Sequence, residues 1–317
     1  MTPLSKKGRF YNRSRPEVKP FILRSLGMFI VAFFKKMMSR NYYQNWHVVE
    51  KVEEKSISPK ITWIGHASFL IQVGGVNILV DPLFEKRTLF FNRFLPPGIP
   101  LKKLPSIDAV LLSHNHYDHL SSVSLKFLKE KHAPLFFVPL GDKRLLSEKN
   151  GYNVKEMSWW QSFYIDPEQK VRVHFLPAHH WSGRSLFDIN QSLWGSWLIE
   201  YKGHTIYFAG DTAWDDHFEQ IKDQFGSIDI ALLPIGPCQP KKWMQNSHLN
   251  AEQAGKAAKV LNARSIIPMH WGTFGFGTDG FLLPIERLKA WWQKNKESMK
   301  ESNLCILKIG QSFKDKK

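Results

Sequence analysis

Residues 113–120 read SHNHYDHL and place three histidines and one aspartate, His114, His116, Asp118 and His119, within six positions. A solvent-exposed loop has no requirement for so many histidine and aspartate side chains, and burying them in a hydrophobic core without polar partners is unfavourable. Each neutral imidazole offers a nitrogen lone pair and a carboxylate offers oxygen, so the set suits a borderline-soft divalent cation such as zinc. His114 and His116 can chelate one ion, whereas Asp118 and His119 lie further round the turn, where they can serve a second ion.

The remaining ligands are expected at the ends of other strands. One segment supplies four ligands, whereas a pair of ions needs about seven together with a bridging water. Sites in such sheets form beyond the carboxyl ends of strands. Four predicted strands are each followed by a residue that can bind a metal ion: AVLLS by His114, VRVHFLPA by His179–His180, TIYFAG by Asp211 and SIIPM by His270. Asp211 also suits a turn or helix cap, His270 also suits a packed core, and the residues alone do not choose between His179 and His180.

Short β-rich runs alternate with helical patches from residue 60 onward. KITWIGHASFLIQVGGVNILVDP predicts three strands with a hairpin turn at Gly74–Gly75, and a second turn is expected at Lys202–Gly203. The uncharged run AVLLS predicts a strand buried on both faces. Helices are expected over VSLKFLKEKH, over PIERLKAWWQKNKESM and over NAEQAGKAAKVLN, where Asn250 is the N-cap and Gln253 completes a capping box. The stretches 60–170 and 171–310 predict two mixed sheets packed face to face with helices outside, an αββα sandwich of the α/β class.

Composition indicates a folded protein whose positive charge is concentrated at the N-terminus. The 317 residues are 43% hydrophobic and 23% charged, which excludes a disordered chain. Cys238 and Cys305 are the only cysteines, which excludes a disulfide scaffold and a cysteine zinc finger and suits a reducing compartment. Of the net charge of +16, +9 falls within residues 1–40. This segment therefore requires an anionic partner.

Residues 1–59 are predicted to form a basic, partly apolar arm ahead of a domain spanning 60–317. The uncharged run from Ser25 to Phe34 is too short to cross a bilayer, which needs about 20 residues. A signal peptide would have a small-residue cleavage site after its apolar run, but Lys35–Lys36 follows here. This disfavours a signal peptide. Two interpretations of residues 21–38 remain: a helix packed on the protein's own core, or an amphipathic helix at an anionic membrane surface. The second predicts a cytoplasmic protein that associates peripherally with membranes through residues 1–40.

The motifs together resemble a known family. HNHYDH with GHASFLI, PAHHW, LWGSW, AGDT and HWGTF is similar to the metallo-β-lactamase fold superfamily and, within it, to the N-acyl-phosphatidylethanolamine-hydrolysing phospholipases D. The resemblance covers residues 60–310 in order. It implies that His114, His116 and His180 bind one zinc, that Asp118, His119 and His270 bind the other, and that Asp211 bridges them, with iron or manganese as alternative metals. The family's QHW triplet falls on residues 179–181, which is what selects His180.

The resemblance also implies roles around the metals. His248 matches a histidine near the family's active site, and His66 and Asp81 match residues that would orient the ligands. Arg184 and Tyr117 would bind substrate. Of the family's pair of basic residues after HW, only Arg184 is present, since Gly183 stands where a lysine is expected.

The implied activity is hydrolysis of a phosphodiester by two zinc ions. Asp211 would accept the proton of the attacking water, and His248 would serve the leaving group. The implied substrate is an N-acyl-phosphatidylethanolamine, cleaved to phosphatidate and an N-acylethanolamine. The alternative is a metal-dependent lactonase or another phosphoesterase of the superfamily acting on a soluble substrate, which would not need the arm. Nucleic acid is a less suitable partner, because the charge sits beside an apolar run. The sequence does not determine whether the chain forms a homodimer.

Overall fold

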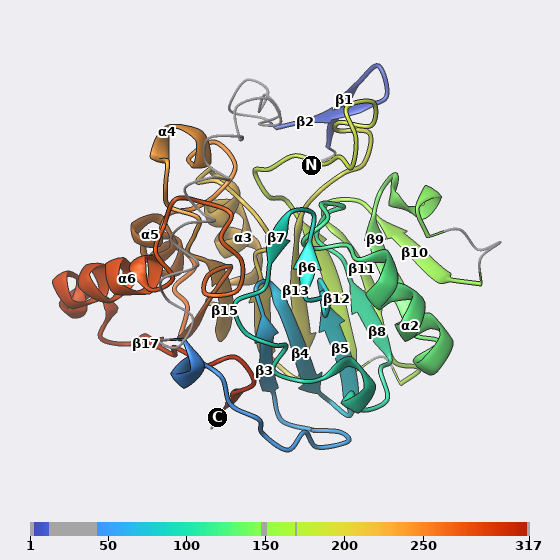
Figure 1. Cartoon of the computed structure of the whole chain (residues 1–317), viewed down its shortest axis with the longest axis horizontal. Helices are drawn as coiled ribbons and strands as arrows, with labels where there is room; N and C mark the ends of the chain where they lie inside the picture. The colour runs from blue at the N-terminus through green and yellow to red at the C-terminus, as the bar shows by residue number, and fades with distance from the viewer. Residues whose placement is uncertain (1–2, 13–42, 147–150, 169, 316–317) are drawn as a thin grey trace.

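The computed structural model describes residues 3–12, 43–146, 151–168 and 170–315. Within them, two seven-stranded mixed sheets lie face to face, with helices on the outside (Figure 1). The predicted αββα sandwich is confirmed. Residues 21–38, for which an amphipathic helix was predicted, lie outside the described residues. The part of the chain that the structure describes contains no helix long and apolar enough to span a bilayer.

The first sheet has the order β10-β9-β8-β5-β4-β3-β18. Its strands are β3 (Lys60–Gly65), β4 (Ser68–Val73), β5 (Val76–Val80), β8 (Ala109–Leu111), β9 (Leu135–Pro139), β10 (Asn153–Met157) and β18 (Ser312–Lys314). Strands β5, β8, β9 and β10 run parallel to one another, whereas β3, β4, β5 and β18 pair antiparallel.

The second sheet has the order β11-β12-β13-β14-β15-β16-β17. Its strands are β11 (Gln161–Tyr164), β12 (Val171–Leu176), β13 (Ser196–Tyr201), β14 (His204–Phe208), β15 (Ile230–Pro234), β16 (Ser265–Met269) and β17 (Asn303–Leu304). Strands β11 to β14 form an antiparallel meander, and β14 to β17 pair in parallel.

Helices cover the outer faces of both sheets (Figure 1). They are α2 (Ser122–His132) beside the first sheet and α3 (His217–Phe225), α5 (Ala251–Val260) and α6 (Leu283–Lys294) beside the second, with the short α4 (Lys241–Met244) near the upper rim. Short 3₁₀ segments are η2 (Gln44–Trp46), η3 (Leu101–Lys103), η4 (Asp142–Arg144) and η6 (Lys296–Met299). Two small hairpins, β1 (Leu4–Lys6) with β2 (Arg9–Tyr11) and β6 (Arg87–Thr88) with β7 (Phe91–Asn92), lie at the same rim.

Side chains that alternate along a strand of the first sheet contribute to two separate hydrophobic cores, one on each face of the sheet. In β8 and the residue after it, Ala109 and Leu111 face the core between the sheets, while Val110 and Leu112 face the core beneath α2. Successive side chains of a strand point to opposite faces, so a strand covered on both sides must be apolar throughout. This is why the uncharged run AVLLS correctly predicted burial on both faces.

Most of the predicted elements are confirmed. The helix expected over PIERLKAWWQKNKESM ends at Lys294 and is followed by the separate 3₁₀ segment η6, and a further difference lies at the boundary between the sheets. The Gly74–Gly75 and Lys202–Gly203 turns join their strands as expected, and Asn250 and Gln253 form the predicted capping box. However, β11 already belongs to the second sheet, and β18 returns to pair with β3 of the first. The predicted division of the chain between the two sheets at residues 170 and 171 was therefore wrong. The sheet to which an edge strand belongs depends on pairing partners that are distant in sequence, and a local pattern does not reveal them.

The segment before residue 60 contacts the domain in the part that is described. Tyr43 stacks on Phe281 with ring centroids 4.0 Å apart, and Val48 donates a backbone hydrogen bond to Ile309. Further upstream, Phe10 donates its backbone N–H to Asn190. The proposed boundary between arm and domain at residues 59 and 60 stays a prediction.

Two glycines allow strand ends to approach closely at the rim. A Cβ on Gly195 would lie 2.5 Å from the Leu176 carbonyl oxygen, and a Cβ on Gly210 would lie 2.7 Å from the Ser113 Cβ. Gly210 also has φ of +59°, in the left-handed region. The glycines of LWGSW and AGDT therefore let the ends of β12, β13 and β14 meet the SHNHYDHL segment.

An indole hydrogen bond ties the two sheets together behind that segment. Trp197 of β13 is fully buried, and its Nε1 donates to the Leu112 carbonyl oxygen at 3.0 Å. Leu112 lies two residues before His114, so this bond holds the start of the histidine-rich segment against the second sheet.

We expect Trp197→Phe to lower the free energy of unfolding by about 2 kcal/mol, because it leaves the buried Leu112 carbonyl without this donor and opens space in the core. Urea denaturation measures the change. Trp292→Phe on the partly exposed side of α6 is the control, with an expected loss below about 0.5 kcal/mol. Equal losses for the two variants would contradict a specific role for the bond between the sheets.

Candidate metal centre

Histidine and aspartate side chains from seven separate segments meet at the rim where the strands end. They follow β8 (the SHNHYDHL segment), β12 (His180), β14 (Asp211) and β16 (His270), or lie at the β3–β4 turn (His66), after β5 (Asp81) and ahead of α5 (His248). These connections lie at the upper end of both sheets in Figure 1. The four strand ends singled out in the sequence therefore do converge.

The first group consists of His114, His116 and His180, whose ligand atoms all lie within 4.8 Å of one another. His116 Nδ1 lies 2.8 Å from His114 Nε2 and 3.3 Å from His180 Nε2. Three imidazole nitrogens facing one point provide the facial set of donors that a single transition-metal ion takes.

Hydrogen bonds behind two of these rings fix the tautomer that faces the site. His180 Nδ1 lies 2.8 Å from the Ser247 carbonyl oxygen, which can only accept, so Nδ1 carries the proton and Nε2 keeps its lone pair. Ser113 donates its hydroxyl to the carboxylate of Asp81 and accepts from His114 Nδ1 at 2.9 Å. His114 Nε2 consequently also presents a lone pair inward.

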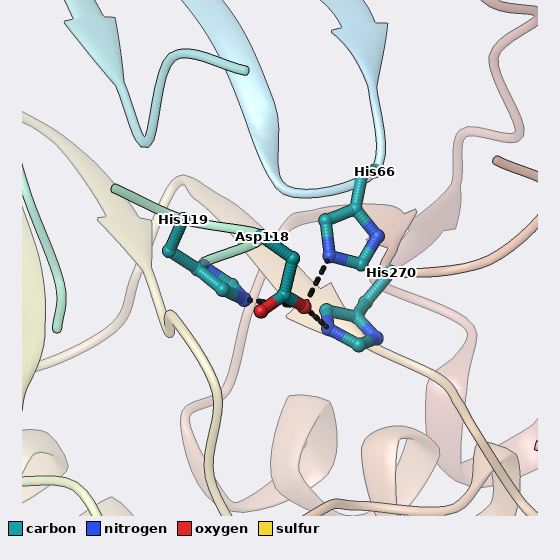
Figure 2. Close-up of side chains that lie close together, drawn as sticks. All are labelled: His66, Asp118, His119 and His270. Carbon is teal, nitrogen blue, oxygen red and sulfur yellow. Dashed lines mark hydrogen bonds and ion pairs between the residues drawn. The ribbon is translucent and has the colours of Figure 1, made fainter. Parts of the chain in front are cut away.

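The second group surrounds the carboxylate of Asp118 (Figure 2). Asp118 Oδ2 lies 3.0 Å from His66 Nε2, 3.5 Å from His119 Nε2 and 3.8 Å from His270 Nε2. The family resemblance implied Asp118, His119 and His270 as one set. His66 was expected only to orient ligands, yet its ring reaches the same carboxylate oxygen and counts geometrically among the candidate ligands.

Asp211 lies between the two groups. Its Oδ2 is 3.2 Å from His119 Nε2 and 3.9 Å from His180 Nε2, and its Oδ1 is 3.1 Å from His270 Nε2. The side chain is almost completely buried. A single carboxylate thus touches rings of both groups, as a bridging ligand must.

Asp81 supports the site from behind. It is fully buried and lies 2.7 Å from His119 Nδ1, and it also accepts the Ser113 backbone N–H at 2.7 Å. A carboxylate on the far nitrogen of a histidine fixes the ring and turns the other nitrogen toward the metal. Asp81 therefore orients His119 directly and, through Ser113, His114.

Several buried polar atoms at this point make no hydrogen bond of acceptable geometry to a described residue, although some lie at ion-pair distance from one another. They are His119 Nε2, His248 Nδ1, His270 Nε2 and Asp211 Oδ1. Buried polar groups of folded proteins are almost always satisfied, and exceptions need an explanation. Metal ions bound between the two groups would satisfy these atoms, and the mixture of imidazole and carboxylate donors suits zinc, iron or manganese.

The electrostatics of the two groups differ. Burial holds the pKa values of His114 and His180 well below the usual range and lowers that of His116 to about 4, so these rings are neutral ligands at pH 7. In the second group burial also disfavours the charged rings, but Asp211 and Asp118 outweigh it and raise the pKa of His270 to about 9. The carboxylates therefore attract positive charge to the place where a cation would bind.

The backbone is turned sharply at three residues of the site. His66, Asp81 and His270 have φ values of +57°, +39° and +61°, in the left-handed region that residues other than glycine rarely adopt. Such strained conformations are kept where the surrounding structure enforces them, and they cluster at functional sites. Here each one turns a side chain at a strand end toward the ligands.

The two adjacent histidines 179 and 180 face different partners. His180 faces the first group, whereas His179 Nδ1 lies 2.5 Å from Asp215 Oδ2 and its backbone N–H donates to Thr212 at 2.9 Å. The fold thus separates two residues that the strand pattern alone could not distinguish.

Arg184 and Tyr117 brace the histidine segment from outside. Arg184 Nη1 donates to the carbonyl oxygens of Asn115 and Leu120, both at 2.9 Å, and its guanidinium lies 3.9 Å from the centre of the Tyr117 ring. The Tyr117 hydroxyl in turn donates to the Arg184 carbonyl at 3.0 Å. Both residues were expected to bind substrate; the Tyr117 ring is exposed beside the site, whereas Arg184 is largely engaged with the chain itself.

His248 and one unforeseen residue complete the site. His248 Nδ1 lies 3.6 Å from Asp211 Oδ2. Asn12, from the segment after β2, donates to the His180 carbonyl at 2.7 Å and accepts the His180 N–H at 3.2 Å. No sequence signal links Asn12 to His180, because the two residues are 168 positions apart and the contact exists only in the folded chain.

Comparison with known proteins agrees with this geometry. Residues 76–271 match the family model of the Beta-lactamase superfamily domain. An N-acyl-phosphatidylethanolamine-hydrolyzing phospholipase D, mitochondrial, of Saccharomyces cerevisiae is 37% identical over 254 residues, which are 77% of this chain and 54% of that protein. The N-acyl-phosphatidylethanolamine-hydrolyzing phospholipase D 1 of Caenorhabditis elegans is 33% identical over 264 residues, covering 79% and 74%. The chain therefore spans about half of the yeast relative and about three quarters of the nematode one.

Solved structures agree on the fold. Igni18, a metallo hydrolase of Ignicoccus hospitalis, superposes with a TM-score of 0.60 at 22% identity and covers 82% of this chain and all of its own. The chain belongs to the metallo-β-lactamase superfamily and is related to the N-acyl-phosphatidylethanolamine-hydrolysing phospholipases D.

Proposed function

We propose that the protein is a dinuclear zinc hydrolase that cleaves the phosphodiester of an N-acyl-phosphatidylethanolamine, releasing phosphatidate and an N-acylethanolamine. The observation that carries the proposal is the position of Asp211 between two groups of buried ligands. A shared carboxylate between two sets of donors is the arrangement that a two-metal hydrolase requires.

In this proposal His114, His116 and His180 hold one ion, Asp118, His119 and His270 hold the other, and Asp211 bridges them. Iron or manganese are alternatives that the same donors accept. Asp81 orients His119, and His66 holds the Asp118 carboxylate. Two bound cations would bring the pKa of a water near neutrality and offset negative charge on the phosphoryl oxygens.

In this proposal two side chains of the protein accept and donate the protons of the reaction. As water attacks phosphorus, Asp211 accepts its proton, while the bond from phosphorus to the ethanolamine oxygen breaks. His248, 3.6 Å from Asp211, is the residue placed to pass this proton from Asp211 on to the leaving alkoxide. Its position on the open side of the site is consistent with this role, because its side chain is more exposed than those of His180 and Asp211.

The lipid substrate is supported by the relatives and by the surroundings of the site. Relatives that are 33–37% identical are named for hydrolysis of N-acyl-phosphatidylethanolamine. Aromatic rings adjoin the ligands: Phe274 and Phe276 lie 5.4 and 5.3 Å from the His66 ring. A small pocket beside His270 is lined by further aromatic side chains, including Phe94 and Phe281. Apolar walls suit a substrate with acyl chains better than a sugar phosphate or RNA.

The N-terminal arm fits a protein that works on a membrane surface. Residues 1–40 carry +9, and part of this segment is apolar. A cytoplasmic protein held peripherally on anionic lipid would meet such a substrate where it resides. In this proposal Arg184 and Tyr117 lie at the entrance, where the ring of Tyr117 is available to substrate.

The first experiment tests substrate class and the bridging carboxylate together. Incubated with an N-acyl-phosphatidylethanolamine, a lactone and RNA, the purified protein is expected to consume the phospholipid. Asp211→Asn should reduce that turnover by roughly 10³-fold or more, because it removes the proton acceptor and the bridging charge, while circular dichroism shows a folded chain. Consumption of the lactone instead of the phospholipid would favour the soluble-substrate alternative, and unchanged turnover by Asp211→Asn would refute the dinuclear assignment.

The second experiment uses the adjacent histidines as a matched pair. Elemental analysis should find about two zinc ions per chain in the protein as purified and about one or fewer in His180→Asn, since one of three ligands is lost. His179→Asn should keep the full content, because His179 is engaged with Asp215 and not with the first group. Equal metal loss in the two variants would argue against the ligand assignment.

The third experiment concerns the arm. Replacing Lys35, Lys36 and Arg40 by serine should weaken binding to vesicles containing phosphatidylserine by roughly tenfold or more at low salt, and less at high salt. Replacing Lys294, Lys296 and Lys300 near the end of α6 removes the same charge elsewhere and serves as control. If the two triple variants sediment with vesicles to the same extent, the arm is not the electrostatic anchor.

A further inference from the structure

Two exposed apolar tips stand at the rim that carries the metal centre. The first is the turn of the β6–β7 hairpin, and the second is part of the loop between β12 and β13. Their large side chains are mostly exposed: Leu89 by 52%, Phe90 by 73%, Leu186 by 59% and Phe187 by 84%. Such exposure of four large apolar side chains near one site marks a surface for a partner.

Both tips are attached to the same ligand-bearing segment. Thr88, next to Leu89, donates its hydroxyl to the Tyr117 carbonyl at 2.9 Å. On the other side the Tyr117 hydroxyl donates to the carbonyl of Arg184, two residues before Leu186. Tyr117 stands between His116 and Asp118, so the two tips lie on either side of the segment that carries these ligands, and both ligand side chains are partly exposed beside it.

Basic side chains accompany each tip. Lys86 and Arg87 are exposed at the base of the first. At the second, Arg9 of β2 donates to the carbonyl oxygens of Phe187, at 3.2 Å, and of Ile189. This contact brings the β1–β2 turn, with exposed Lys6 and Lys7, to the same loop.

We propose that these two tips form a lipid-docking face, with Leu89, Phe90, Leu186 and Phe187 inserted below the phosphates of an anionic bilayer and the basic residues paired with those phosphates. The inference rests on the proposed function and deepens it. Docked in this way, the opening beside Tyr117 faces the bilayer, and a phospholipid headgroup reaches the ligands without leaving the membrane.

Charge favours a bilayer over a second copy of the chain as the occupant. A symmetric contact between two copies would bring like charges of Lys6, Lys7, Lys86 and Arg87 together, whereas anionic phosphates neutralise them. Apolar tips rimmed by lysine and arginine are the pattern of an interfacial membrane site. The tips contribute apolar insertion, which salt does not screen, whereas the N-terminal arm contributes salt-sensitive attraction.

The test uses the full chain and vesicles of phosphatidylcholine and phosphatidylserine without substrate. The double variants L89S/F90S and L186S/F187S should each bind vesicles about tenfold or more weakly, at both low and high salt, because each loses the burial of two large apolar side chains. The matched control is V49S/I57S, which removes two side chains exposed by 74% and 64% in the segment between η2 and β3, at the opposite end of the sheets (Figure 1). Its binding should stay within about twofold of the original protein.

Three readouts decide the outcome. Vesicle binding by the tip variants equal to that of the control overturns the proposal. Sedimentation equilibrium that finds a dimer dissociated by the tip substitutions overturns it as well, since the face then joins two copies. Turnover of detergent-dispersed N-acyl-phosphatidylethanolamine needs no bilayer docking and so reports on hydrolysis alone. The tip variants should retain this turnover. If even the original protein lacks this turnover, the proposed function fails, while vesicle binding still decides the docking face.

Discussion

The site depends on one electrostatic constraint: lone pairs and carboxylate charges are buried so close together that positive charge must sit between them. The three nitrogens of His114, His116 and His180 face one point, and Asp118 and Asp211 draw charge onto neighbouring rings. Without a cation, protons on His119 and His270 are what balance the carboxylates. In the proposed function, two divalent ions would supply the same balance and provide the catalytic metals.

The rest of the fold serves to hold these groups in place. Asp81 and the Ser247 carbonyl fix ring orientations, Trp197 ties the sheets together behind the ligand segment, and Gly195 and Gly210 let strand ends approach. A metal centre needs this support because ligands that relax toward one another would lose the geometry that holds an ion. The core between two sheets covered by helices provides it, since residues on well-packed strands have little freedom to move.

The same rim carries the candidate ligands and exposed apolar side chains. The SHNHYDHL segment supplies ligands inward through His116 and Asp118 and presents the Tyr117 ring outward between two apolar tips. Arg184 is the basic residue expected at the headgroup, but its guanidinium braces the backbone of this segment. The proposed recognition of a lipid therefore depends on the placement of the whole rim as much as on any single charged side chain.

The sequence by itself determined the αββα sandwich and the residues that meet at its rim, because strand alternation, turn residues and ligands at strand ends are local patterns. It placed Asn250 and Gln253 in their capping box, and it identified the four strand ends that converge. The tertiary structure decided what depends on contacts between distant segments: that His66 reaches Asp118, that β11 belongs to the second sheet and β18 to the first, and that Asn12 holds His180. Side-chain direction at a strand end, edge pairing and contacts across 168 residues are set by packing in three dimensions, so no local pattern encodes them.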